Sequence, residues 1–464
     1  MGCGASKASD GGLPPSRTNA TTLRAMHTQL SAEHKRGAAV SEQAEDAPAP
    51  EAAPEAAPEA PAPAAEEAPA EATPVPVTGD VVRVVVYSSR EYEVELFENT
   101  AAEFKQKGIN VVLDLIEAPL NVRTASFAKE ATAVCAFVND DVGTETIQFL
   151  RNNTSVRIIL MRCAGFNNVD LAAAGRCEIA VVRVPEYSPY AVAEHSVALA
   201  MSLNRKIHRA YTRNRDLNFS LVGLLGFDMR GKTVGIVGTG KIGIAAANIY
   251  LGFGCKVVAQ SRSARPELVE KGVEYMSIEE LCKVSDIISL HAPLTKGTKY
   301  CINRETISVM KDGVMIINTS RGALLETSAA LEAIKSGKIG ALGLDVYENE
   351  SDIFFNDHTG EILEDDVFTR LVNYPNVLVT GHQGFLTREA ISSICAQTLG
   401  NLQEFVTAKE SGTAFADLKL KNGIVATDVE IAEDRTKMAS RAWGALKRLQ
   451  TLRMYYDSHP DDTW

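Results

Sequence analysis

A glycine loop that follows a run of β-branched residues constrains the fold of this chain more than any other feature. Residues 233–237 (TVGIV) are typical of a buried strand, and the loop 238–243 (GTGKIG) leads from them into an apolar helix that ends near Leu251. In such a loop the first glycine makes a tight turn, the second lets the backbone approach a pyrophosphate, and the third lets the helix pack closely on the strand. The positive end of the helix dipole then faces the phosphates. A second predicted strand at 256–259 supplies the context that this dinucleotide-binding motif requires. The loop residues expected to bind the dinucleotide are Gly238, Thr239, Gly240, Lys241, Ile242 and Gly243.

The remainder of the chain alternates between strand-like and helix-like patterns from about residue 80 onward. A long helical pattern runs from 189 to about 214. Strands that alternate with helices predict an α/β fold with parallel sheets. The continuous apolar runs that predict further buried strands are 81–87, 133–138, 157–161 and 180–184.

Size and charge exclude several classes of protein. At 464 residues the chain is long enough for two or three domains. Its net charge of −12 argues against a general nucleic-acid binder, which needs clustered positive charge. The sequence contains no run of about 18 apolar residues, the length that would predict a membrane-spanning helix. The eight cysteines are scattered without a C-x-x-C pair, which favours reduced thiols over disulfides or a metal site.

The first residues match the pattern of a doubly acylated N-terminus. After removal of Met1, Gly2 with Ser6 at the fifth position fits N-myristoylation. One myristoyl chain gives only weak, reversible membrane binding, and Cys3 could supply a second anchor by S-palmitoylation. We therefore expect the chain at the cytoplasmic face of a membrane. The alternative is an unmodified N-terminus on a cytoplasmic protein.

The segment that follows has no hydrophobic periodicity up to about residue 78, and 46–76 consist almost entirely of Ala, Pro and Glu. Such a composition cannot bury enough apolar surface to offset its conformational entropy. We expect residues 1–79 to form a disordered tail that holds the folded body away from the membrane. A tail without a role is the alternative.

Three residues of complementary chemistry follow the glycine loop. Arg321 lies in the string NTSRG, Glu350 closes the string DVYENE, and His382 lies in the string TGHQ. Reduction of a 2-keto acid needs a cation for the carboxylate, a proton donor for the ketone, and an anion that keeps this donor charged. These three residues are therefore the predicted catalytic residues of a keto-acid reductase.

Several longer strings occur in a fixed order along the chain: RCAGFNNVD at 162–170, the glycine loop, NTSRG at 318–322, GLDVYENE at 343–350 and GHQGFLT at 381–387. Through them, residues from about 80 to 412 resemble the fermentative D-lactate dehydrogenases of bacteria, a group within the D-isomer-specific 2-hydroxyacid dehydrogenase family. The resemblance implies two Rossmann-like parallel-sheet domains and a homo-oligomer. A discontinuous substrate domain, 80–185 plus 380–416, would hold an inserted dinucleotide-binding domain, 186–379. Residues 417–464 would form a C-terminal extension.

The resemblance also implies roles for the site residues. His382 would be the general acid in reduction and the base in oxidation, with Glu350 rather than Glu348 at its other ring nitrogen. Arg321 would bind the substrate carboxylate and the developing oxyanion. From their positions alone, in the long helical pattern and in the loop 291–293, His195 and His291 are expected to be structural. The other implied residues are the backbone amides of Ala164 and Gly165 for the carboxylate, Tyr187 and Phe385 for the side-chain pocket, and Asp345 beside the nicotinamide.

One position departs from the NAD-binding members of this family. They place an aspartate after the second strand to bind the ribose hydroxyls, and Ser261 stands there in this chain. An acidic residue would repel a 2′-phosphate, whereas a hydroxyl with Arg262 and Arg265 nearby would accept one. We predict that NADP(H) is accepted and slightly favoured over NAD(H). Use of both cofactors without a preference is the alternative.

The C-terminal extension contains a helical pattern at 430–456, with a basic second half. It could be a helix docked on the folded body, a basic amphipathic membrane contact, or a target of a calmodulin-like protein.

Together these features predict an NAD(P)-dependent D-lactate dehydrogenase that reduces pyruvate at a membrane surface. A glyoxylate or hydroxypyruvate reductase is one alternative, because the pocket residues do not exclude it. A dinucleotide-sensing protein related to corepressors is another, and turnover would separate it from an enzyme.

Overall fold

The structure, a computed structural model, describes residues 81–425. The predicted acylation sites Gly2 and Cys3, the tail 1–79 and the helical pattern at 430–456 lie outside these residues. They stay predictions from the sequence.

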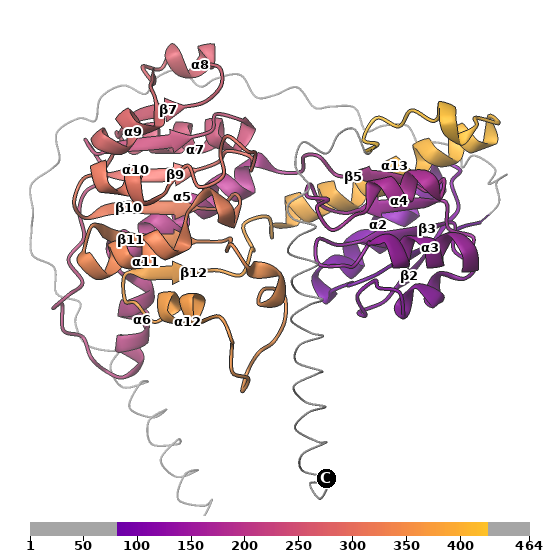
Figure 1. Ribbon diagram of the computed structural model, residues 1–464, viewed down its shortest axis with the longest axis horizontal. Coiled ribbons are helices and arrows are strands. Elements are labelled where there is room, and N and C mark those ends of the chain that lie inside the picture. Colours follow the sequence, from indigo (N-terminus) through magenta and orange to yellow (C-terminus); the bar gives the residue numbers. More distant parts are fainter. Residues whose placement is uncertain (1–80, 426–464) are drawn as a thin grey trace, which may run out of the picture. The chain divides into compact units, whose positions relative to one another are not determined.

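Two parallel sheets with flanking helices make up the described residues (Figure 1). The first sheet has the strand order β2-β1-β3-β4-β5, and every pair in it is parallel. Its strands are β1 (Val82–Val86), β2 (Val111–Leu115), β3 (Ala133–Ala136), β4 (Ile158–Met161) and β5 (Ala180–Arg183). The helices and 3-10 turns between or after them are α2 (Glu91–Gln106), η1 (Thr124–Ala128), α3 (Thr144–Asn153), α4 (Leu171–Arg176), α13 (Arg388–Glu410) and η4 (Phe415–Asp417).

The second sheet has the order β12-β11-β10-β9-β6-β7-β8, again with parallel pairs throughout. Its strands are β6 (Thr233–Val237), β7 (Lys256–Gln260), β8 (Glu274–Tyr275), β9 (Ile287–Leu290), β10 (Val314–Asn318), β11 (Ile339–Leu344) and β12 (Val377–Val379). Its helices and turns are α5 (Pro189–Arg205), α6 (Ile207–Arg215), α7 (Lys241–Gly252), α8 (Pro266–Val269), α9 (Ile278–Val284), α10 (Arg304–Val309), η2 (Gly322–Leu324), α11 (Thr327–Ser336), η3 (Glu350–Asp352) and α12 (Asp366–Val372). From β8 to β11 this is the doubly wound order of dinucleotide-binding folds, with the reversal between β6 and β9.

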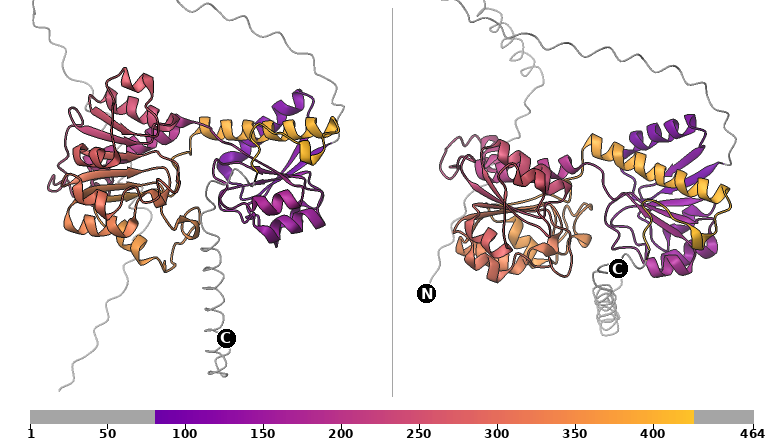
Figure 2. Two further views of the ribbon diagram at one scale, coloured as in Figure 1. Left: turned by 45° about the horizontal axis from the view of Figure 1, so that its top comes forward. Right: turned by 90° about the horizontal axis from the view of Figure 1, so that it is seen from above.

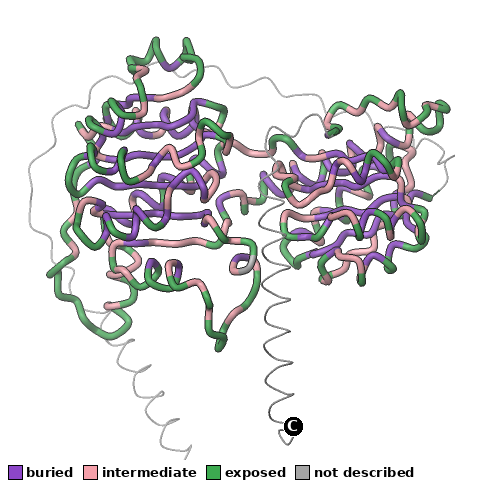
Figure 3. The backbone as a smooth tube through the Cα atoms, in the orientation of Figure 1, coloured by how far each residue is buried: buried purple, intermediate pink, exposed green. Residues whose placement is uncertain are grey.

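The apolar runs in the sequence explain why both sheets form. The strand residues are almost continuously buried because helices cover both faces, as expected for parallel sheets (Figure 3). Each sheet has one apolar core on either face. The predicted fold class, α/β with two Rossmann-like parallel sheets, is confirmed.

Helix α13 packs on the first sheet, although it follows the second sheet in sequence. Its Ile391, Ile394 and Phe405 join the core that contains Val84 and Ile158, and it lies alongside α2 (Figure 2). The chain thus returns to the first sheet after completing the second. The predicted domain boundaries remain our proposal.

The long helix predicted from 189 to about 214 is interrupted at Lys206. This residue has a φ of 54°, in the left-handed region, and separates α5 from α6. Helix α5 packs on α7 and the second sheet, whereas α6 buries none of its residues. No helix between residues 81 and 425 is long and apolar enough to cross a membrane.

Candidate active site

The predicted site residues lie in loops that follow the carboxyl ends of parallel strands. Arg321 follows β10, Asp345 follows β11 and His382 follows β12. On the first sheet, Ala164 and Gly165 follow β4. Ligands of open α/β sheets bind outside these ends, so the topology explains why residues far apart in sequence can share one site.

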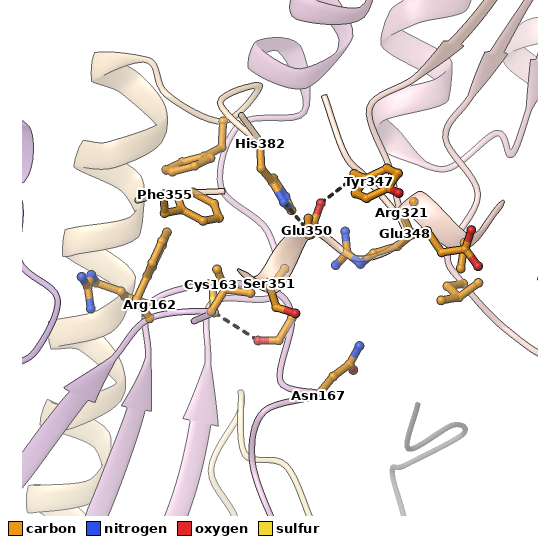
Figure 4. Close-up of a pocket in the computed structure, with 18 of the residues that line it drawn as sticks. Arg162, Cys163, Asn167, Arg321, Tyr347, Glu348, Glu350, Ser351, Phe355 and His382 are labelled. Atoms are coloured by element: carbon orange, nitrogen blue, oxygen red, sulfur yellow. Dashed lines mark hydrogen bonds and ion pairs between the residues drawn. The ribbon is translucent and has the colours of Figure 1, made fainter. Parts of the chain in front are cut away.

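These loops line a cavity of about 220 Å³. Figure 4 shows Arg321, Glu350 and His382 among the side chains that line it. The predicted substrate-contact residues that also line it are Ala164, Gly165, Tyr187 and Phe385.

His382 and Glu350 form an ion-pair contact inside this cavity. The Nδ1 atom of His382 lies 3.0 Å from Oε1 of Glu350, which leaves Nε2 as the other ring nitrogen. The second oxygen of Glu350 accepts a hydrogen bond from the backbone N–H of Tyr347 at 2.9 Å. Glu348 is engaged elsewhere, because it accepts hydrogen bonds from the hydroxyls of Tyr300 and Thr327. The geometry therefore pairs the histidine with Glu350.

Asp345 holds the loop that carries His382. Its carboxylate accepts hydrogen bonds from the hydroxyl of Thr380 at 2.6 Å and from the backbone N–H groups of Gln383 and Gly384 at 2.9 and 2.8 Å. Burial acts to raise the pKa of Asp345, but hydrogen bonds, first that from His195, outweigh it and hold the pKa below its usual value. Asp345 is therefore a buried anion that fixes the left-handed turn at His382, where φ is 55°.

Arg321 is positioned by a tight loop between β10 and η2. The side-chain amide of Asn318 donates to the carbonyl of Arg321 at 2.9 Å. A Cβ on Gly322 would lie 2.1 Å from the carbonyl carbon of Tyr347, so this position accepts only glycine. A Cβ on Gly165 would lie 3.6 Å from Nη2 of Arg321, which shows how closely the guanidinium approaches that backbone. Arg321 and the Ala164–Gly165 backbone thus form one corner of the cavity.

A second cavity of about 620 Å³ shares Arg321 and His382 with the first and extends to the glycine loop. It is lined there by Gly240, Lys241 and Ile242 at the start of α7. Lys241 forms an ion pair with Glu186, in the segment between β5 and α5. We call the smaller cavity the catalytic cavity, after the predicted catalytic residues that line it. This cavity and the glycine loop belong to one continuous site.

The two predicted phosphate-binding arginines differ in their surroundings. Arg262 lines the larger cavity, whereas Arg265 donates from Nε to the carbonyl of Thr239 at 3.0 Å. The hydroxyl of Tyr275 donates to Oγ1 of Thr239 at 3.2 Å and accepts from the backbone N–H of Arg265. Ser261 follows β7 directly and is half-buried.

The two other histidines considered in the sequence, His195 and His291, differ in their surroundings: His195 lines neither cavity, whereas His291 lines the larger one. His195 lies 3.0 Å from the hydroxyl of Thr380 and 3.3 Å from Asp345. Burial lowers the pKa of His291 to about 4, so this histidine is neutral near pH 7, with Nε2 2.9 Å from the hydroxyl of Ser289.

Comparison with known proteins identifies the family. Residues 197–384 match the family described as D-isomer specific 2-hydroxyacid dehydrogenase, NAD binding domain. The D-lactate dehydrogenase of Escherichia coli is 48% identical over 321 residues, which cover 69% of this chain and 96% of that protein. The chain belongs to the D-isomer specific 2-hydroxyacid dehydrogenase family. A 2-hydroxyacid dehydrogenase homolog of Haemophilus influenzae is 47% identical over 328 residues, 71% of this chain and 97% of that protein.

A solved structure from a study of the pyruvate reductase of Chlamydomonas reinhardtii has a TM-score of 0.67 and 43% identity, and the match covers 74% of this chain and 98% of that one. Membership of this family makes the chain a D-2-hydroxyacid dehydrogenase that uses a nicotinamide dinucleotide and a small 2-hydroxy acid.

The glycine loop of this D-2-hydroxyacid dehydrogenase fits the NAD that the family's domain binds. Gly238 has a φ of 93°, and a Cβ there would lie 2.6 Å from the backbone nitrogen of Ala292. A Cβ on Gly243 would lie 1.9 Å from the carbonyl oxygen of Gly238. Both positions therefore require glycine, and the close turn leaves the first turn of α7 lining the larger cavity.

Sequence reasoning missed two aromatic residues of the candidate active site, Phe137 and Phe355. Both line the catalytic cavity with Tyr187 and Phe385. Phe137 directly follows β3, a position that marks it as a loop residue near the carboxyl edge. Phe355 has a φ of 69°, in the left-handed region, and no feature of the sequence predicts this backbone conformation for a phenylalanine.

Proposed function

We propose that this chain is an NAD(P)-dependent D-lactate dehydrogenase that works mainly as a pyruvate reductase. The observation that carries the proposal is the 3.0 Å contact between His382 Nδ1 and Glu350 Oε1 in the cavity that also contains Arg321. These are the proton donor, its anionic partner and the carboxylate-binding cation that reduction of a 2-keto acid requires.

In the proposed reaction the bound reduced nicotinamide supplies a hydride to the keto carbon of pyruvate. His382, protonated and held by Glu350, donates the proton on Nε2 to the ketone oxygen, which becomes the hydroxyl of lactate. Arg321 binds the carboxylate together with the backbone of Ala164 and Gly165, and its charge stabilises the negative charge that grows on the ketone oxygen. In lactate oxidation the same histidine, neutral, accepts the hydroxyl proton.

The test is the initial rate of pyruvate reduction by the purified full-length protein, with NADH and NADPH compared at subsaturating concentrations. Fast turnover with D-lactate as the product supports the proposal. Nucleotide binding without turnover would overturn it in favour of a sensor, and turnover of glyoxylate or hydroxypyruvate alone would reassign the substrate.

For the cofactor, we propose that NADP(H) is accepted and slightly favoured. Ser261 replaces the acidic residue that would repel a 2′-phosphate, and Arg262 lines the cavity beside it. The contact of Arg265 with Thr239 makes this arginine a support of the loop rather than the first phosphate ligand.

We also propose that the enzyme is a homo-oligomer and that acylation of Gly2 and Cys3 tethers it to a membrane. The homo-oligomer proposal is supported by the loop after α6, which exposes an apolar group of side chains. Hydrogen bonds from Arg213 to the carbonyls of Ser220 and Val222, at 2.7 and 2.9 Å, hold this loop in shape. A fixed loop with exposed apolar side chains is typical of a protein interface. These side chains are Leu217, Phe219, Leu221, Val222 and Leu225.

A further inference from the structure

One side of the catalytic cavity is a wall of aromatic rings. The rings of Phe137 and Phe355 meet edge to face, with centroids 5.4 Å apart and an interplanar angle of 86°. Phe385 continues the wall, with centroids 6.2 Å from Phe137 and 6.3 Å from Tyr187. The wall therefore combines residues from both sheets. Phe137 and Tyr187 follow strands of the first sheet, and Phe355 and Phe385 lie in loops of the second.

Phe355 is the member of this wall that also lies against the proton donor. Its ring centroid is 5.7 Å from that of His382, with the rings tilted by 38°. Figure 4 shows the two side chains next to each other at the cavity, on the side away from Arg321. One side chain thus contacts both the apolar wall and the histidine.

The backbone around Phe355 is shaped to present this ring. Phe355 has a φ of 69°, a strained conformation for a residue with a Cβ. Its neighbour Phe354 is buried and packs on Phe368, with centroids 5.8 Å apart, and its N–H donates to the carbonyl of Glu350 at 2.8 Å. The left-handed turn lets Phe354 enter the core while Phe355 lines the cavity.

Phe137, the ring that Phe355 meets edge to face, also has a fixed neighbour. The guanidinium of Arg162 lies 4.8 Å from the centroid of Phe137, and this buried arginine makes two hydrogen bonds to Glu93, at 3.2 and 3.0 Å. The side-chain amide of Asn139 lies 3.4 Å from the carbonyl of Phe354. Phe137 therefore packs against a buried arginine that is itself fixed by Glu93.

We propose that Phe355 is a specificity-determining residue that limits the group on the keto carbon to about the size of a methyl. The inference rests on the proposed function. When Arg321 holds the carboxylate and His382 the ketone oxygen, the remaining substituent of the keto carbon faces the apolar part of the cavity. Because Phe355 contacts His382, its ring lies close to that carbon and closes the wall against longer side chains.

The test compares Phe355→Ala and Phe355→Gly with the wild-type enzyme on pyruvate, 2-ketobutyrate and phenylpyruvate. Both variants open the wall, and glycine also relieves the left-handed strain, so the pair separates an effect of space from an effect of the backbone. We expect kcat/KM for phenylpyruvate relative to pyruvate to rise at least about tenfold in both variants, as for other changes in pocket size.

The matched control is Phe127→Ala, which removes an exposed phenylalanine on η1, outside the cavity. In this variant the ratio of kcat/KM for phenylpyruvate to that for pyruvate should equal the wild-type ratio. An unchanged ratio in both Phe355 variants overturns the inference, and so does a loss of pyruvate reduction without any gain on the larger acids. A wild-type enzyme that reduces none of the three acids would instead refute the proposed function.

Discussion

At the scale of single residues, the pair of His382 and Glu350 can be tested against a second pair of the same kind. His358 and Glu361 are 2.6 Å apart in a loop and do not line the catalytic cavity. We expect His382→Asn to lower kcat/KM for pyruvate reduction at least about 100-fold, because the general acid is lost. Fluorescence titration should show that nucleotide binding persists. His358→Asn should leave both quantities unchanged, and a His382→Asn enzyme of near-normal activity would contradict the assignment.

The cofactor preference depends on two neighbouring residues. Ser261→Asp together with Arg262→Ala places an anion where the 2′-phosphate would lie and removes the cation from the cavity. We expect the ratio of kcat/KM for NADPH over NADH to fall at least about tenfold, since one charge-assisted contact is worth more than about 1.4 kcal/mol. Arg265→Ala is the control, and its ratio should change less because Arg265 bonds to Thr239. An unaltered ratio in the double variant would show that Ser261 and Arg262 do not determine the cofactor preference.

The sequence predicted Arg321 and His382 from their chemistry, because each is the only cation or proton donor of its local string, whereas the choice of Glu350 over Glu348 rested on the family resemblance. Arg321, Glu350 and His382 could be named because a cation, an anion and a proton donor complement one another, and the structure brings all three to one cavity. Phe137 and Phe355 could not, because a phenylalanine is ordinarily a core residue. Only the tertiary contact of the Phe355 ring with His382 shows that it borders the predicted proton donor.

At the scale of elements, the patterns found the strands but not every break. The predicted strand at 233–237 matches β6, because β-branched residues favour a sheet that is buried on both faces. The break at Lys206 was missed, since neither glycine nor proline marks it. The left-handed lysine is stabilised by contacts that a periodicity does not reveal, including a hydrogen bond from its Nζ to the carbonyl of Leu203 at 2.9 Å.

The exposed loop after α6 leads to a prediction about assembly. Leu225 is 90% exposed, and burying it against a second copy would stabilise an oligomer. We expect Leu225→Glu to shift the protein to a smaller species in sedimentation velocity at micromolar concentration. Ile362→Glu is the control, because Ile362 is 94% exposed but lies outside this loop. Identical sedimentation of the wild type and Leu225→Glu would exclude this loop as the interface.

At the scale of the whole molecule, His291 links stability to pH. Its folded pKa of about 4 lies below the ordinary value of 6.5, because burial disfavours the charged ring. Well above pH 6.5, at about pH 7.5, the histidine is almost entirely neutral in both the folded and the unfolded chain. As the pH falls towards 4, the unfolded chain takes up a proton that the folded chain refuses, so the free energy of unfolding decreases.

We expect His291 to lower the free energy of unfolding by about 2 kcal/mol at pH 5 relative to pH 7.5. Urea unfolding at pH 7.5 and pH 5 should show a smaller pH-dependent loss for His291→Gln than for the wild type. Equal losses would mean that His291 is not the group that couples folding to pH in this range.

Membrane attachment is also a property of the whole molecule, because the predicted acylation sites precede the described residues while the predicted catalytic side chains lie within them. Gly2→Ala removes the amine that myristate needs, so we expect this variant to leave the membrane fraction of a eukaryotic cell completely and to lose incorporation of a myristate analogue. Cys3→Ser should retain the myristate and dissociate only in part, because a single acyl chain binds weakly and reversibly. Pyruvate reduction by the purified variants should equal that of the wild type, which separates anchoring from catalysis. A Gly2→Ala protein that stays in the membrane fraction would place the anchor elsewhere.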